Sequence, residues 1–314
     1  MRSFRALARA TLLATLAVIV WGAYVRASGS GAGCGSHWPL CNGEVIPRPK
    51  SMATVIELTH RVTSGLALIL TVVQLVVAFR TFPVRHPIRR AAAASMAFMV
   101  SEAGVGAGLV LFEMVAHNKS AARALWMSAH LINTFFLLGA MALTLYLAHD
   151  KPAPRFVGPR LAPVTLLAVG ILLVSVAGAI VALGDTLFPA QSLAEGLRAD
   201  LTPGAHFLIR LRALHPILAV FVGVAVSAVS RSIASGAGPD VRRWAFILNA
   251  AFVVQMTIGV ANLLLRAPIG IQLVHLLVAD LYWMSAVIFA ATVLASEQSL
   301  ATPDGEGSRQ RLLG

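Results

Sequence analysis

Charged residues and cysteine are scarce in this chain of 314 residues. Only 12% of the residues are charged and 58% are hydrophobic, and the mean hydropathy is +0.80. A soluble domain carries roughly twice that charged fraction, so the composition excludes the soluble globular class. The only cysteines, Cys34 and Cys41, are too few for a structural zinc site. Strict alternation of apolar and polar residues is also rare, which argues against a transmembrane β-barrel.

What the sequence has instead is eight apolar stretches of about 20 residues each, long enough to cross a hydrocarbon core of about 30 Å. They cover approximately residues 8–27, 54–79, 91–112, 123–148, 161–183, 207–230, 242–264 and 269–295. We therefore predict an all-α integral membrane protein with eight transmembrane helices. The first stretch resembles a signal peptide, but it has a counterpart later in the chain, so we interpret it as a transmembrane helix.

The net charge of +12 is unevenly distributed. Fifteen of the 25 basic residues fall before the first stretch, in every second connection and in the tail, which is the positive-inside pattern. It predicts a bacterial-type plasma membrane protein with both termini cytoplasmic, and it argues against a nucleic-acid partner. The other ten lie at or near the outer helix ends: Arg26, Arg48, Lys50, Arg61, Lys119, Arg123, Arg198, Arg210, Arg212 and Arg266. They indicate either an anionic ligand or interfacial side chains whose heads reach water.

The first four stretches resemble the last four. Gly22 in GAYVRA corresponds to Gly178 in GAIVAL, and the pair Glu102 and Gly106 corresponds to Gln255 and Gly259. Repeats with four helices each share one orientation, so we predict two tandem four-helix bundles related by a pseudo-twofold axis along the membrane normal. The halves are residues 1–150 and 151–296, followed by a disordered cytoplasmic tail, 297–314.

Four histidines occupy matching places: His60, His130, His215 and His275 each lie about seven residues into every second apolar stretch. This spacing puts each roughly 10 Å below the outer surface. An imidazole in lipid is costly without a partner. Four at one depth predict two metal centres with two imidazoles each, and haem is the obvious candidate. The simplest pairs are His60 with His130 and His215 with His275; crossed pairs, or four hydrogen-bonded core histidines, are the alternatives.

The remaining histidines are interpreted as solvated or interfacial: His37, His86, His117, His149 and His206. Glu57 is different, because it lies one turn before His60 on the same helix face. It could carry protons, hydrogen bond to the imidazole or be an interfacial charge. The matching part of the second half reads Leu211-Arg212 and has no acid, which suggests a substrate site in the first half and a resident redox cofactor in the second.

Two other acids, Glu102 and Asp280, lie within apolar stretches and should be functional or paired. Cys34 and Cys41 lie in the first outer loop, where an oxidising compartment favours a structural disulfide. A redox-active pair, or a metal site that includes His37, are the alternatives.

Taken together, these motifs resemble those of the haem A synthase family of bacterial and mitochondrial membranes, across essentially all eight stretches. The resemblance is carried by GCG and WPLC around Cys34 and Cys41, by ELTHR at Glu57–Arg61, by His130, by LHP around His215, by His275, and by GDTLFP at 184–189. It implies oxidation of the C8 methyl group of haem O to the formyl group of haem A, in two hydroxylation-level steps.

The resemblance also implies roles. His60 and His130 would bracket the substrate haem, His215 and His275 would ligate the iron of a resident haem b, and Glu57 would be the catalytic acid. The implied partners are a haem O synthase, a cytochrome oxidase and an electron acceptor that the sequence does not identify. Some family members carry a second cysteine pair after the fifth helix; residues 184–206 have none here, and we expect them to form a lid over the resident haem.

Two other functions would use the same histidines. One is a quinol-linked electron carrier with two b haems, neither of them chemically changed. The other is a haem transporter or chaperone without redox chemistry.

Overall fold

The structure, a computed structural model, describes residues 1–48 and 51–301, and within them every regular element is a helix. The helices are α1 (Arg2–Ala27), α2 (Met52–Thr81), α3 (Pro87–Leu111), α4 (Ala121–Ala148), α5 (Leu161–Leu187), α6 (Leu193–Leu201), α7 (Phe207–Arg210), η1 (Leu211–Ala213), α8 (Leu214–Ser235), α9 (Pro239–Leu264) and α10 (Ile269–Ala301). Eight candidate spans result, with α7, η1 and α8 forming one of them. The predicted all-α membrane fold is confirmed.

Local sequence signals mark where several of these helices begin. Ser51, Ser120 and Ser192 precede α2, α4 and α6, and each side chain accepts a hydrogen bond from a first-turn amide. Pro87 and Pro239 stand in the first turns of α3 and α9, where no intrahelical N–H is needed. Between these ends the spans bond their own backbone groups, which is what a lipid environment requires.

The predicted boundary between the fifth helix and the loop after it is wrong. Residues 184–187 belong to α5, because the amide of Phe188 still donates to the carbonyl of Gly184 at 2.8 Å. Gly184 is also packed tightly: a Cβ there would lie 2.8 Å from the carbonyl oxygen of Leu208. The connection therefore begins at Phe188, and it contains the helix α6. The tertiary contact with Leu208, which periodicity cannot reveal, fixes this boundary.

Two other ends also differ from the prediction. The sixth span continues to Ser235 and is interrupted by η1, directly before the helix that carries His215. The last helix continues to Ala301, five residues into the predicted disordered tail. Residues 302–314 and Lys50 lie outside the described residues.

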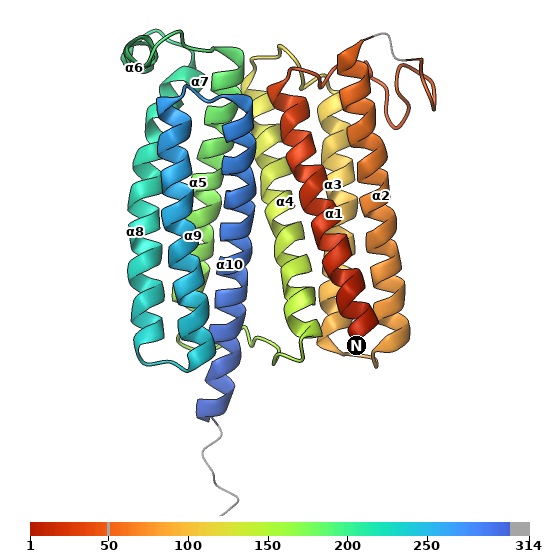
Figure 1. Ribbon diagram of the computed structural model, residues 1–314, viewed down its shortest axis with the longest axis vertical. Helices are drawn as coiled ribbons and strands as arrows, with labels where there is room; N and C mark the ends of the chain where they lie inside the picture. Colours follow the sequence, from red (N-terminus) through yellow and green to blue (C-terminus); the bar gives the residue numbers. More distant parts are fainter. Residues whose placement is uncertain (49–50, 302–314) are drawn as a thin grey trace, which may run out of the picture.

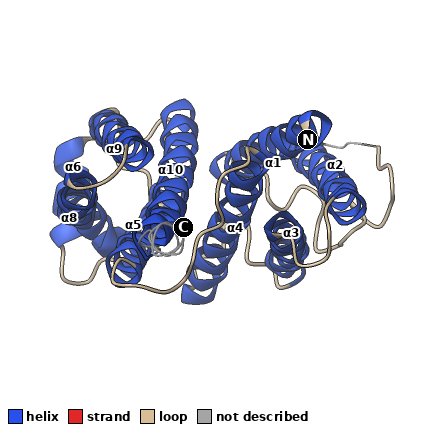
Figure 2. Cartoon of the chain, turned by 90° about the horizontal axis from the view of Figure 1, so that it is seen from below, coloured by secondary structure: helices blue, strands red, loops and turns tan. Residues whose placement is uncertain are grey.

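The helices form two groups side by side, α1–α4 and α5 with α8–α10, as Figures 1 and 2 show. We call the end that holds Met1 and the connections 82–86, 149–160 and 236–238 the N-terminal end. The opposite end, which holds residues 28–48 and α6, is the disulfide end. The helices α2, α4, α8 and α10 all start at or close to the disulfide end and run away from it (Figure 1).

The two groups meet along α4 and α10, and α1 and α5 also contribute to the contact. The largest buried cluster draws side chains from both groups, with Phe135 of α4 fully buried and Trp283 of α10 only 4% exposed. Their rings stack with centroids 5.3 Å apart, and Trp283 donates its indole N–H to the carbonyl of Phe135. By contrast, Phe221 of α8 and Phe246 of α9 are 72% and 74% exposed, as expected for lipid-facing positions.

Replacing Trp283 with Phe should weaken the contact between the two groups. The change removes the indole N–H and with it a buried hydrogen bond between the groups, at a cost of about 0.5–1.5 kcal/mol. Thermal unfolding of the detergent-solubilised protein measures the effect. The matched control is Phe221→Leu on the exposed face of α8, and an equal loss of stability in both variants would contradict the assignment.

Candidate functional site

The four predicted histidines lie at one level along the helices. His60, His130 and His275 stand six to nine residues inside α2, α4 and α10, and His215 stands eight residues after Phe207, where the α7–α8 span begins. At 1.5 Å per residue these offsets amount to about 9 to 14 Å from the disulfide end. His60 and His130 belong to one group of helices, and His215 and His275 to the other.

Two of the imidazoles pack directly on glycine backbone. A Cβ on Gly22 of α1 would lie 2.9 Å from Cε1 of His60, and a Cβ on Gly178 of α5 would lie 2.9 Å from Cε1 of His215. No alanine fits at either position unless the ring moves. The sequence repeat had already matched Gly22 with Gly178, and each proves to face the histidine of the following span.

The other two histidines show the same arrangement with more space. A Cβ on Gly259 of α9 would lie 3.1 Å from Cε1 of His275, and one on Gly106 of α3 would lie 3.8 Å from Cε1 of His130. Gly106 and Gly259 are again matched in the repeat. Each histidine ring therefore faces a glycine of the span before it, in both halves; the symmetry axis itself stays a prediction.

The nearness of the rings within each half indicates direct pairs. His60 interacts electrostatically with His130, and His275 interacts with His215. The Nδ1 atom of each of the four is buried and has no hydrogen-bond partner. A buried nitrogen without a partner is costly, so four such atoms fit a bound group that engages the imidazoles.

The donor set fits haem better than a bare metal ion. Within residues 1–48 and 51–301 no three His, Cys, Asp or Glu side chains gather closely enough to hold a metal ion. A haem needs only two axial ligands from the protein, since the porphyrin supplies four nitrogens. Each half offers two imidazoles, which is the number required.

Polar side chains adjoin the second histidine of each half. Oε1 of Glu102 lies 3.6 Å from Nδ1 of His130, and Glu102 also accepts hydrogen bonds from Asn133 and Thr134. In the second half Nε2 of Gln255 lies 3.3 Å from Nε2 of His275. Glu102 and Gln255 were matched in the repeat, and a carboxylate beside Nδ1, as in the first half, can orient an imidazole that binds iron through Nε2. The Gln255 amide would have to turn away if Nε2 of His275 bound iron.

Glu57 is buried at 3% exposure, and both its oxygens are engaged. The amide of Cys34 donates to Oε2 at 2.9 Å, and Arg61 forms an ion pair with Oε1. Arg61 in turn donates to the carbonyls of His37 and Leu40, at 2.6 Å each. Glu57 and Arg61 therefore hold the loop 33–41 on α2, directly beyond His60.

Within that loop Cys34 and Cys41 form the predicted disulfide, and both are buried. The loop also packs closely on α2, because Thr54 donates its hydroxyl to the carbonyl of Gly33 at 2.8 Å. The bonded pair leaves no thiols for a metal site with His37.

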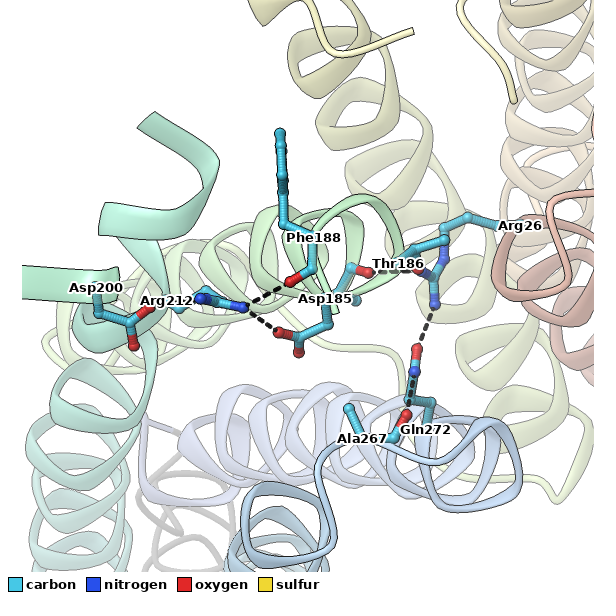
Figure 3. Close-up of polar contacts among 9 residues, drawn as sticks. Arg26, Asp185, Thr186, Phe188, Asp200, Arg212, Ala267 and Gln272 are labelled. Carbon is cyan, nitrogen blue, oxygen red and sulfur yellow. Dashed lines mark hydrogen bonds and ion pairs between the residues drawn. The ribbon is translucent and has the colours of Figure 1, made fainter. Parts of the chain in front are cut away.

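In the second half Arg212 has acidic partners that the sequence did not reveal. Arg212 donates to Asp200 at 2.8 Å, to the carbonyl of Phe188 at 3.2 Å and to Asp185 at 3.4 Å (Figure 3). The prediction that this region has no acid is correct for the sequence beside Arg212 but not for its surroundings in space, because Asp185 comes from α5 and Asp200 from α6. Only tertiary structure brings them together.

Asp280 is fully buried on α10, and neither of its oxygens has a hydrogen-bond partner.

Several of the remaining histidines have ordinary local roles. His86 and His206 accept bonds from the first-turn amides of α3 and α7, and His149 bonds to the carbonyl of Leu145. These contacts agree with the interpretation that they lie at helix ends rather than bind a ligand.

Comparison with known proteins gives the chain a family context. The family model COX15-CtaA, described as cytochrome oxidase assembly protein, matches residues 5–287. Two Thermus thermophilus relatives named protoheme IX farnesyltransferase are 45% identical over 286 residues, which cover 90% of this chain and 47% of theirs. Heme A synthases of Bacillus mycoides and Bacillus cereus are 41% identical over 111 residues, which cover 35% of this chain and 36% of theirs. The chain thus spans about half the length of the curated Thermus relatives.

Replacing Glu57 with Ala should loosen the disulfide loop. The Cys34 amide loses its acceptor and Arg61 loses its ion-pair partner, so we expect the Cys34–Cys41 bond to be reduced several-fold faster by dithiothreitol. The rate is measured by alkylating the released thiols at successive times and determining the increase in protein mass by mass spectrometry.

The control for this variant is Thr59→Ala, on an exposed position of α2 where the hydroxyl bonds only within the helix. Equal reduction rates in the two variants would show that Glu57 does not secure the loop.

Proposed function

This chain belongs to the COX15-CtaA family of cytochrome oxidase assembly proteins, and we propose that it is a haem A synthase that oxidises the C8 methyl group of haem O to a formyl group. The observation that carries the proposal is the repeated contact between histidine and glycine. In each half two imidazoles lie at one level, and each packs on the backbone of a neighbouring helix.

The reaction is an oxidation by four electrons. The methyl group and one water molecule give the aldehyde, four protons and four electrons. In two hydroxylation-level steps the carbon passes through an alcohol and then a geminal diol, which loses water. An electron acceptor takes up the electrons.

We place the substrate in the first half, residues 1–150, with haem O between His60 and His130. Glu57 lies one helical turn from His60 towards the disulfide end, and its ion pair with Arg61 fixes the position of the carboxylate. As the catalytic acid, Glu57 would stabilise positive charge that develops at the substrate carbon, or accept the proton released there. Glu102 would orient His130.

We place the resident haem b in the second half, residues 151–296, with His215 and His275 as its axial ligands. When bound, this group supplies one-electron redox chemistry. The buried Nδ1 atoms and the close approach of Gly178 and Gly259 support the assignment. The connection 188–206, held to η1 through Arg212, is the proposed cover of this site.

The names of the relatives fit this choice. More than half of each Thermus farnesyltransferase lies outside the matched region, so its named activity can reside in the unmatched part. The Bacillus heme A synthases match this chain directly, although over a shorter region. Farnesylation of protohaem would produce the proposed substrate, so a haem O synthase is the natural donor and a cytochrome oxidase the natural recipient.

The charges support an orientation. Basic residues crowd the N-terminal end, among them Arg80, Arg85 and Arg89, so we place this end in the cytoplasm of a bacterial-type cell and the disulfide end outside. Both sets of histidines then lie in the outer half of the bilayer.

The proposal predicts a product. In cells that make haem O but no haem A, expression of this chain should yield a formyl porphyrin, detected by chromatography and mass spectrometry of extracted pigments. Glu57→Ala should keep bound haem but lose the product, because haem ligation by histidine does not need the carboxylate.

Three results of this experiment would overturn the proposal. Two unaltered b haems at full occupancy would favour a quinol-linked electron carrier, and bound haem O that stays unchanged would favour a haem transporter or chaperone. If the chain instead farnesylates protohaem when given a farnesyl donor, the name of the Thermus relatives would apply to it.

Substituting the glycines that face histidines should remove haem. In Gly178→Ala the new methyl group meets the ring of His215 at 2.9 Å, so we expect several-fold lower haem b content in the absorption spectrum of the purified protein. Gly22→Ala should lower the occupancy of the first site in the same way. Gly106→Ala, whose Cβ would lie 3.8 Å from His130, should have a smaller effect.

Gly104→Ala is the matched control, because no heavy atom lies within 4 Å of its Cβ position. Alanine favours a helix over glycine by about 1 kcal/mol, so this variant should be folded and retain its haem. Equal haem content in Gly178→Ala and Gly104→Ala would contradict the assigned ligand position.

A further inference from the structure

Two arginines of the first half, the half-buried Arg26 and the buried Arg123, lie near the disulfide end without a carboxylate partner. Within the part of the chain that the structure describes, no ion pair involves Arg26 of α1 or Arg123 of α4. The other two inward-placed arginines at this level differ, since Arg61 is paired with Glu57, and Arg212 is paired with two aspartates.

Arg26 reaches across to the second half and bonds only to neutral acceptors. Nη1 donates to the carbonyl of Ala182 and to the hydroxyl of Thr186, at 2.8 Å each. Nη2 donates to Oε1 of Gln272 at 3.0 Å, and Gln272 in turn donates to the carbonyl of Ala267 (Figure 3). The charge of Arg26 is therefore solvated by dipoles but not neutralised.

Arg123 is more deeply enclosed. Its side chain is 3% exposed, Nη1 donates to the carbonyls of Ala116 and Asn118, and the buried Nε has no partner at all. A buried arginine keeps its proton, so this donor remains unsatisfied.

The two cations also repel each other, since Arg123 lies within electrostatic range of Arg26. The acid that interacts with Arg26, Asp185, is itself bonded to Arg212. Two like charges with little access to water, one of which keeps a buried donor without a partner, are stabilised most directly by a bound anion.

The helical register connects these cations to the first pair of histidines. Arg26 lies one turn beyond Gly22, which packs on His60, and Arg123 lies two turns before His130 on the same face of α4. Both guanidinium groups thus belong to helices that form the first site, about 6 to 10 Å nearer the disulfide end.

We propose that Arg26 and Arg123 bind the carboxylate side chains of the tetrapyrrole held between His60 and His130. This assignment rests on the proposed function, because it takes haem O as the ligand of the first half. A haem carries two propionates on one edge of its ring, which matches two guanidinium groups that both lie on the disulfide-end side of the histidines. The inward-placed arginine of the second half, Arg212, is already paired with Asp185 and Asp200.

The test compares ferric haem O with its dimethyl ester, which has the same ring and iron but no negative charge. Binding is followed by the absorption spectrum in the variant His215→Ala/His275→Ala, which keeps only the first site. Loss of charge-assisted hydrogen bonds should weaken binding of the ester about 10- to 100-fold. Adding Arg26→Gln and Arg123→Gln should weaken the diacid to the level of the ester and leave the ester unchanged.

Two variants make the comparison specific. Arg198→Gln, on the exposed surface of α6, should leave both affinities unchanged. Arg26→Lys with Arg123→Lys keeps the charges and should restore much of the preference for the diacid. If the double glutamine variant does not fold, the comparison of the diacid with the ester in the protein that keeps both arginines still tests whether the site binds the carboxylates.

The outcomes separate this assignment from the proposed function. Equal affinities for diacid and ester would overturn the carboxylate site and leave the haem site standing. The variant His60→Ala/His130→Ala keeps only the second site. If this variant alone binds the diacid more tightly than the ester, the assignment to the first half is wrong. If neither ligand binds the first site, the proposed function fails as well.

Discussion

The whole arrangement depends on placing an imidazole beside helix backbone in an apolar interior. A polar ring in lipid needs a partner, and a ring that must lie against a neighbouring helix needs a position without a Cβ. Gly22, Gly178 and Gly259 meet that requirement with contacts that no other residue type allows without movement. The four rings come to one level because each belongs to a helix that starts at the same end of the molecule.

The disulfide end is organised by the need to neutralise arginine. In the first half the ion pair of Arg61 and Glu57 ties the loop 33–41 to α2, so the residue proposed for chemistry also shapes the cover of its own site. In the second half the same need is met by Asp185 and Asp200, which fasten α5 and α6 to the start of the α8 span. The halves use one physical device, with the charges supplied from different elements.

The interface between the halves has an apolar part deep in the core and a polar part at the disulfide end. Trp283 and Phe135 stack deep in the shared core, and Arg26 crosses the junction at the disulfide end. Arg26 comes from the helix whose Gly22 supports His60, and it reaches Gln272, one turn from His275. A single helix end therefore touches the surroundings of both proposed haem sites.

The sequence by itself determined the number of spans, the matching depth of the histidines and the pairing of the repeats, because length, hydropathy and spacing are local properties that a helix converts directly into height. It also predicted the disulfide from two cysteines in one outer loop. Tertiary structure alone decided that α5 continues past Gly184, that Arg212 meets two acids, and that Arg26 and Arg123 lie together without one. Those features depend on which helix faces which, and residues 12 to 97 positions apart in the chain carry no spacing signal for that.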